Sequence, residues 1–319
     1  MICNYKVNIY FMVKIFSAII IFILSVYISS YFTAGDQLAY NKAYYGIIGL
    51  DIFSAYLHYQ GSVGSLEPIH FFISWIVSNL GMEKDIFIAF SNSILVYILI
   101  SVLQSWRVSI TVIISIVFFN FYFTVLYFSA ERLKFGIILL LLSVLNYKNY
   151  KKSIFFTFFA IITHVQTAII YISILFKKVF LDILNLFHTG KLSKNIVYLS
   201  FLFTIPIIIL SDHIFYKFSS FTSLFGIQDL IKTFLFFIMS LYYSKDKKET
   251  ALIFIPLFVM IIFVGDTRIN MLSYFIFLYY SLQINRGLNF GILVTSLYFG
   301  YKSIDFVSNI FLYGNGFIK

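Results

Sequence analysis

Five polar side chains stand out in an otherwise apolar chain because their types suit chemistry on phosphate and sugar groups. They are Asp36, Glu67, Arg132, His164 and Arg268. An arginine guanidinium is planar, keeps its proton and donates paired hydrogen bonds to phosphate or carboxylate. A carboxylate or a neutral imidazole can take the proton of an attacking hydroxyl. The set predicts a site that binds an anionic group and activates a hydroxyl.

The two arginines are the candidates for the anion. Arg132 lies in FSAERLKFG (128–136) between long apolar runs, and Arg268 lies in GDTR. We expect both at outer helix ends, where the positive-inside rule gives no reason for a cation, and two converging arginines suit a diphosphate headgroup. The simpler alternative pairs Arg132 with Glu131 or a lipid phosphate, and Arg268 with Asp266.

The three acid–base candidates each have a structural alternative. Asp36 is either a general base for a sugar hydroxyl or a solvated turn residue, and Glu67 is either a base or a helix cap. His164 interrupts an apolar run, where a neutral imidazole is often a hydrogen-bonded packing residue. His70 lies one turn beyond Glu67 on the same predicted helix face and makes a weaker candidate pair with it.

Several enzyme classes lack their motifs. The sequence contains no HExxH, CxxC, GxGxxG, GxxxxGK or GxSxG, which excludes the usual zinc peptidase, ATPase and serine esterase sites. The DxD pair of many metal-dependent glycosyltransferases is also absent. We therefore expect no metal and no cofactor. The single cysteine, Cys3, permits no internal disulfide.

The composition indicates an integral membrane protein. Of 319 residues, 61% are hydrophobic and only 11% are charged, too few to coat a soluble globule of this size. Segments such as IFSAIIIFILSVYISSYF are apolar on every face, which favours helices over barrel strands. We predict an all-α polytopic fold with about 9 to 11 transmembrane helices, forming one membrane domain over residues 1–319.

The net charge of +10 is distributed as short clusters at the ends of apolar runs, namely KNYKK (148–152), KK (177–178) and KDKK (245–248). This positive-inside pattern argues against a nucleic-acid partner. Lys6 and Lys14 place the N-terminus inside. The first run, about 9–32, is then a retained signal anchor.

The segment 33–84 is predicted to be a long outer loop that carries Asp36, Asp51, His58, Glu67 and His70. Within it, EPIHFFISWIVSN begins with Glu-Pro, a favourable helix start, but its apolar core is short for a crossing. We expect an interfacial or re-entrant helix over 67–80.

The remaining crossings follow from the charge clusters. Helices at about 86–104, 108–128 and 133–147 place Arg107 inside and Arg132 outside. Lysine clusters flank both ends of 153–176, which favours a broken helical hairpin over a plain crossing. Later helices are predicted at about 196–211, 228–244, 250–265, 269–284 and 288–306, with Arg286 inside and Arg268 outside.

The order of these features resembles the EpsG family, which groups Wzy-type polymerases of bacterial O-antigen, capsule and exopolysaccharide. The resemblance rests on an Asp-containing outer loop, on EPIHFFISWIVSNLG (67–81), on ERLKFGIILLLL (131–142) and on ITHVQTAIIYIS (162–173). It covers roughly residues 30–175. Membrane glycosyltransferases of the GT-C type, which also place an acidic loop and an interfacial helix after their first crossing, are similar in layout.

The resemblance implies a glycosyltransferase at the periplasmic face of the bacterial inner membrane. It would join undecaprenyl-diphosphate-linked oligosaccharide repeat units, with undecaprenyl diphosphate as the leaving group and without metal or nucleotide. Arg132 and Arg268 would bind diphosphate, and Asp36, Glu67 or His164 would take the hydroxyl proton. Membrane lipid and a Wzz-type chain-length regulator are the implied partners.

Two other classes stay open. A flippase or transporter for lipid-linked sugars would also need cations inside a helical bundle, but the ionisable residues gather on one side and no halves repeat. An O-antigen ligase or another outer-leaflet transferase would share the same substrates.

Overall fold

The computed structural model describes residues 2–190, 230–264 and 266–317, with isolated positions between 204 and 215. Every regular element in these ranges is helical, in agreement with the predicted all-α class. The chain forms two compact units, Met1–Thr163 with Arg286–Lys319, and His164–Asn285. No Pro-rich or low-complexity linker marks this division, so composition alone suggested one domain.

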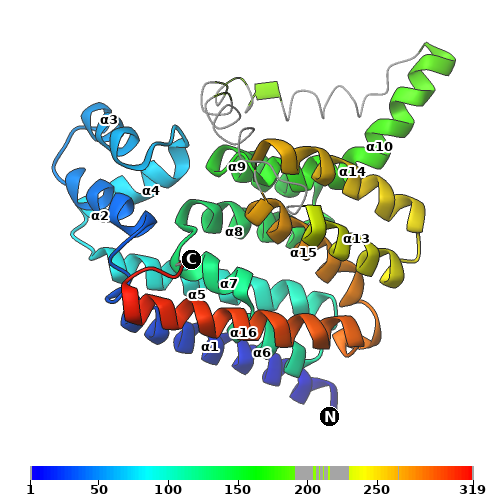
Figure 1. Cartoon of the computed structure of the whole chain (residues 1–319), viewed down its shortest axis with the longest axis horizontal. Coiled ribbons are helices and arrows are strands. Elements are labelled where there is room, and N and C mark those ends of the chain that lie inside the picture. Colours follow the sequence, from blue (N-terminus) through cyan, green and yellow to red (C-terminus); the bar gives the residue numbers. More distant parts are fainter. Residues whose placement is uncertain are drawn as a thin grey trace. The chain divides into compact units, whose positions relative to one another are not determined.

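The first unit contains ten helices of the described residues (Figure 1). They are α1 (Ile2–Ser29), α2 (Asp36–Gly46), α3 (Ile52–Val63), α4 (Pro68–Asn79), α5 (Lys84–Ser105), α6 (Ile110–Phe118), α7 (Phe121–Phe128), α8 (Glu131–Leu145), α9 (Tyr150–Thr163) and α16 (Phe290–Tyr313). Helix α5 packs against α1 and α8, and α8 packs against α9.

The second unit contains α10 (Thr167–Thr189), α13 (Leu230–Tyr243), α14 (Lys247–Val264) and α15 (Asp266–Ser281) among its described residues. Helix α14 packs against α10, and α13 packs against α15. The short 3₁₀ turn Asn285–Gly287 joins this unit to α16. The predicted helix at 196–211 lies almost entirely outside the described residues.

By length and hydropathy, two helices of the described ranges could cross a membrane, Ile9–Ser29 and Lys84–Ser105. Helices α6 and α7 would make a third span if the pair, bent by 49°, counts as one. The predicted continuous helix at 108–128 is therefore wrong in detail. Asn120 interrupts it, because its side chain accepts hydrogen bonds from the backbone N–H groups of Tyr122 and Phe123 and caps α7.

The two ends of the first unit are distinct. At one end, Tyr10 Oη donates to the Val108 carbonyl at 3.0 Å and Ser109 N donates to the Arg286 carbonyl at 2.9 Å. At the other end, Ala34 N donates to the Gly314 carbonyl at 2.9 Å, which ties the end of α1 to the end of α16. Arg107 and Arg286, both assigned to the inner side by the sequence, thus share one end.

The outer loop of the sequence prediction contains three helices, not one. The helix expected at 67–80 is confirmed as α4, with Pro68 in its first turn. Helices α2 and α3 were missed, although Asp51 shows a standard start signal: its carboxylate accepts from the N–H groups of Phe53 and Ser54. Gly64, in the left-handed region at φ 64°, ends α3.

The segment 153–176 is interrupted where the sequence indicated. Helix α9 ends at Thr163 and α10 begins at Thr167, so the break covers residues 164–166. The expected end near 176 is wrong, because α10 continues through Lys177 and Lys178 to Thr189. Lysine is a good helix former, and no residue before Gly190 supplies the left-handed C-cap.

Candidate functional site

The charges at the start of α8 are buried. Glu131 and Lys134 are 1% and 0% exposed, and Arg132 is 8% exposed. The helix macrodipole favours an acid such as Glu131 in the first turn but disfavours the two cations beside it. Their burial therefore requires partners from other helices.

Arg132 finds its anionic partner in the loop before α4. Its Nη1 donates to Glu67 Oε2 at 2.9 Å, and its Nε donates to the Tyr40 hydroxyl at 3.2 Å. Glu67 is fully buried, and the same Oε2 accepts from Ser65 Oγ at 3.2 Å. The Arg132 guanidinium thus connects three segments: α8, α2 and the start of α4.

A second ion pair lies beside the first. Lys84 Nζ, at the first residue of α5, lies 3.0 Å from Glu131 Oε1 and also donates to Gln37 Oε1. Gln37 Nε2 donates to the Phe128 carbonyl at 2.7 Å. The amide of Gln37 therefore joins the ion pair to the last turn of α7.

Lys134 has a neutral partner. Its Nζ donates to Asn92 Oδ1 at 2.7 Å, and Asn92 Nδ2 donates to Ser25 Oγ at 2.9 Å and to the Tyr127 carbonyl at 3.0 Å. No carboxylate oxygen of the described residues lies within ion-pair distance of Lys134. Burying an ammonium with an amide alone leaves its charge largely uncompensated.

These five charged side chains form what we call the ionic cluster: Glu67, Lys84, Glu131, Arg132 and Lys134. It contains three cationic side chains and two carboxylates. Four members are 3% exposed or less, and Arg132 is the most accessible at 8%. The cluster is therefore short of one anion when every member is ionised.

His70 borders the cluster as a neutral imidazole. Its Nδ1 lies 2.7 Å from the Tyr59 hydroxyl, and its Nε2 lies 3.9 Å from Glu131 Oε2, too far for a hydrogen bond. The pKa of His70 is lowered to about 3, chiefly by burial; Glu131 opposes this shift, and Arg132 and Lys134 add to it.

This pKa predicts acid sensitivity. The unfolded chain protonates His70 near its ordinary pKa of about 6.5 and the native protein only near pH 3, so the unfolded state binds more protons between these values. Stability should fall by about 2 kcal/mol from pH 7 to pH 5 on account of this group. His70→Gln keeps an acceptor for the Tyr59 hydroxyl. In this variant the free energy of unfolding, measured in detergent, should depend less on pH. His58→Gln on α3 is the matched control, and an equal change in both variants would contradict the assignment.

The structure brings together two of the five predicted site residues, Glu67 and Arg132. Asp36 is exposed in the first turn of α2 and does not belong to the cluster, although its neighbour Gln37 does. His164 and Arg268 belong to the second unit. There His164 Nε2 bonds Gln166 Oε1 at 2.9 Å, and Arg268 is half-buried near the start of α15.

Some simpler alternatives prove wrong. Glu67 occupies the N-cap position of α4, but its side chain makes no capping hydrogen bond and instead holds Arg132. Arg132 pairs with Glu67 and not with its neighbour Glu131, which pairs with Lys84. His70 and Glu67 share a helix start, yet the imidazole bonds Tyr59.

Sequence reasoning missed Lys84 and Gln37 as site residues, and it noted Lys134 without giving it a role. Lys84 was expected outside its helix, which begins two residues earlier than the predicted 86. The sequence did contain a signal for Lys84. It is a lysine at the start of an apolar helix, on the side predicted to have few other cations, and such a lysine needs an anionic partner.

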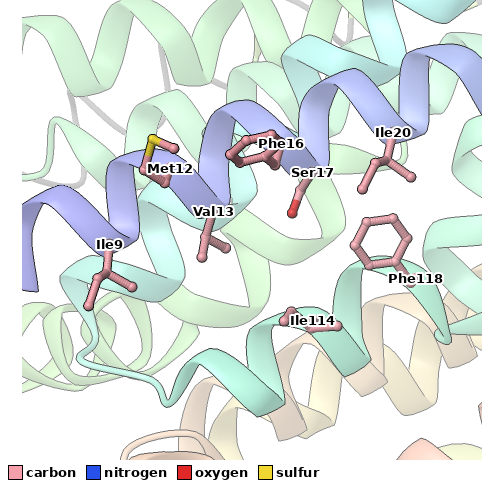
Figure 2. A pocket seen from close by; sticks show the side chains of 8 residues that line it. All are labelled: Ile9, Met12, Val13, Phe16, Ser17, Ile20, Ile114 and Phe118. Carbon is pink, nitrogen blue, oxygen red and sulfur yellow. The ribbon is translucent and has the colours of Figure 1, made fainter.

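An apolar groove lies along α1 and α6, away from the ionic cluster. It has a volume of about 570 Å³ and is lined by Ile9, Met12, Val13, Phe16, Ser17, Ile20, Ile114 and Phe118. Figure 2 shows that Ile9, Val13 and Ile20 point toward Ile114 and Phe118. Its lining offers hydrocarbon contacts and one hydroxyl, so it has no means to bind or activate a polar substrate.

The described part of the chain contains no group of three or more His, Cys, Asp or Glu side chains that could hold a metal ion. Comparisons with protein-family models, with curated proteins and with solved structures found no match.

Proposed function

We propose that the protein is a polysaccharide polymerase that joins undecaprenyl-diphosphate-linked oligosaccharide repeat units, as in O-antigen or capsule synthesis. The observation that carries this proposal is the ionic cluster, which holds three cationic side chains and two carboxylates, with Arg132 the least buried at 8% exposed. A guanidinium that binds planar anions in a bidentate way suits a lipid diphosphate headgroup.

The placement of the cluster supports a reaction at a membrane surface. Its contacts link the start of α5, a candidate span, to α2 and to the start of α4. A headgroup bound there would keep its prenyl chain in hydrocarbon and its sugars in water. We propose about 9 to 11 crossings in a bacterial inner membrane, with this end of the first unit facing the periplasm.

The proposed reaction is glycosyl transfer. A hydroxyl of one lipid-linked unit attacks the anomeric carbon of the growing chain, the bond from that carbon to the diphosphate oxygen breaks, and undecaprenyl diphosphate leaves with the electron pair. Arg132 offsets the charge that develops on the leaving diphosphate, and Glu67 is the nearest carboxylate to accept the hydroxyl proton. Arg268 remains a second candidate for diphosphate, and a Wzz-type chain-length regulator a candidate partner.

The test is the length distribution of lipopolysaccharide. A deletion strain should carry single repeat units on lipid A core, and expression of the wild-type chain should restore the long ladder. Loss of a flippase would instead prevent outward delivery of repeat units, and loss of a ligase would strand long polymer on undecaprenyl diphosphate.

Arg132→Lys sharpens this test. Lysine keeps the positive charge beside Glu67 but lacks the planar fork, so at normal protein level the long ladder should be lost. Arg107→Lys is the matched control, because Arg107 is exposed at the opposite end of the first unit. A full ladder with Arg132→Lys would remove the guanidinium from the mechanism.

A further inference from the structure

The apolar groove between α1 and α6 follows a helix that could cross a membrane. Its lining on α1 extends from Ile9 to Ile20, within the candidate span Ile9–Ser29. At a rise of about 1.5 Å per residue, these two positions are about 16 Å apart along the helix axis. The hydrocarbon core of a bilayer is about 30 Å thick. The groove therefore has roughly the length of one leaflet.

The groove is open along its side as well as apolar. Five of its lining side chains are between 40% and 55% exposed: Ile9, Met12, Phe16, Ile20 and Ile114. In Figure 2 the side chains of α1 and α6 border one elongated hollow between the two helices. Its volume of about 570 Å³ lies in the range of pockets that hold a single small ligand. This shape suits one extended hydrocarbon chain.

One end of the groove adjoins two arginines of the same unit. The Tyr10 hydroxyl, at the N-terminal end of the α1 lining, donates to the Val108 carbonyl at 3.0 Å, and Val108 directly follows Arg107. The backbone N–H of Ser109 donates to the Arg286 carbonyl at 2.9 Å. The backbones of Arg107 and Arg286 thus lie beside the same end of the groove.

Both arginines are exposed, and neither forms an ion pair with a carboxylate of the described ranges. Their backbones lie in the left-handed region, with φ of 60° for Arg107 and 56° for Arg286, where glycine is the usual residue. An arginine at such a position has a less favourable backbone than a glycine would have. Two of them at one end of the groove therefore indicate a role for the side chains.

We propose that the groove and these two arginines bind an anionic phospholipid. One acyl chain lies along α1 and α6, and the phosphate lies near Arg107 and Arg286. Guanidinium groups bind phosphate with charge-assisted hydrogen bonds, and burial of the acyl chain against the groove removes apolar surface from its surroundings. A zwitterionic lipid carries its own cation, so its attraction to this end is weaker.

The proposed lipid site is separate from the ionic cluster, which lies at the other end of the first unit. It does not depend on glycosyl transfer, and it adds a ligand of a different class. A lipid that binds only the native state also stabilises it, and the contacts of this one would connect α1, α6 and the turn before α16.

Photocrosslinking of the full-length chain in phosphatidylcholine vesicles tests the proposal directly. Trace phosphatidylglycerol or phosphatidylcholine, each with a diazirine in one acyl chain, is illuminated, and the labelled peptides are identified by mass spectrometry. Phosphatidylglycerol should label segments 9–20 and 110–118 about tenfold more than phosphatidylcholine. Unlabelled phosphatidylglycerol should compete for these segments, a measurement that needs no variant.

The headgroup contact is tested by charge. A basic residue near the membrane surface contributes about a factor of five to the binding of an anionic lipid. The double variant Arg107→Gln with Arg286→Gln should therefore lower the labelling ratio to about one. Arg107→Lys keeps the charge and should retain the ratio. Lys151→Gln with Lys152→Gln is the matched control, because it removes two exposed cations of the same unit away from the groove.

The acyl-chain contact is tested by filling the groove. Ile114→Trp places a large ring in its lining and should reduce labelling by phosphatidylglycerol at least fivefold, on the order of the loss of one good apolar contact. Ile19→Trp is the control, since Ile19 is 49% exposed on the same candidate span but does not line the groove. Circular dichroism of each variant establishes that it is folded.

Several outcomes would overturn the lipid site. Equal labelling of the wild type by the two lipids would remove the role of the arginines, and labelling confined to other segments would remove the groove. Stronger labelling by a photoactivatable polyprenyl phosphate would assign the groove to an isoprenoid chain, and cross-links between two protein chains at 9–20 would assign it to a second copy. None of these results bears on the polymerase, which is tested by the polymer ladder.

Discussion

Glu131→Gln should destabilise the protein by about 3 to 5 kcal/mol, because it removes one of two carboxylates from a buried cluster of three cations. Lys84, 3.0 Å away and only 3% exposed, would keep its charge without a carboxylate partner. The amide of glutamine fills the same space as the carboxylate, so packing is preserved. The loss of stability therefore measures the effect of removing the charge. Unfolding in mixed micelles with a denaturing detergent measures the free energy.

Glu83→Gln is the control for Glu131→Gln. Glu83 immediately precedes Lys84 and is exposed, so the same chemical change should alter stability by less than about 0.5 kcal/mol. A loss of similar size in both variants would show that the burial of Glu131 does not matter, and the described cluster would then be wrong.

Arg132→Met should also cost about 3 to 5 kcal/mol, since Glu67 would remain fully buried without its cation. The double variant Glu67→Met with Arg132→Met should recover most of this loss, because an apolar pair of similar volume avoids the desolvation of both charges. The two single variants and the double variant form a cycle, again measured by unfolding in mixed micelles.

The cycle separates a role in stability from a role in function. Recovered folding in the double variant together with a lost polymer ladder would mean that the pair is retained for chemistry. Additive losses in the two single variants, with no recovery in the double variant, would contradict the direct contact between Arg132 and Glu67.

Much of the helical pattern followed from local sequence. The helices expected at 228–244, 250–265 and 269–284 agree with α13, α14 and α15 to within about three residues at each end, the usual uncertainty of helix boundaries. The failures occur where a polar side chain acts on the backbone. Asn120 splits one predicted helix, and Asp51 starts a helix within a predicted loop.

The candidate site was predicted in part. Arg132 and Glu67 were named because an arginine opening an apolar helix and a carboxylate before a proline are visible in the chain. Their contact was not visible, since 65 residues separate them. Asp36 attracted attention by its charge, whereas the buried side chain at that turn is the neutral Gln37.

The amino-acid sequence by itself determined the all-helical, membrane-compatible character of this protein and the approximate positions of most described helices. These properties depend on composition and on hydrophobic runs within one segment, which a short window of sequence contains. The tertiary structure alone decided which charge meets which. Each of three buried pairs joins separate segments of the chain: Lys84 with Glu131, Arg132 with Glu67, and Lys134 with Asn92. A buried charge needs whichever partner the packing of helix ends brings within about 4 Å, and no local pattern encodes that distance.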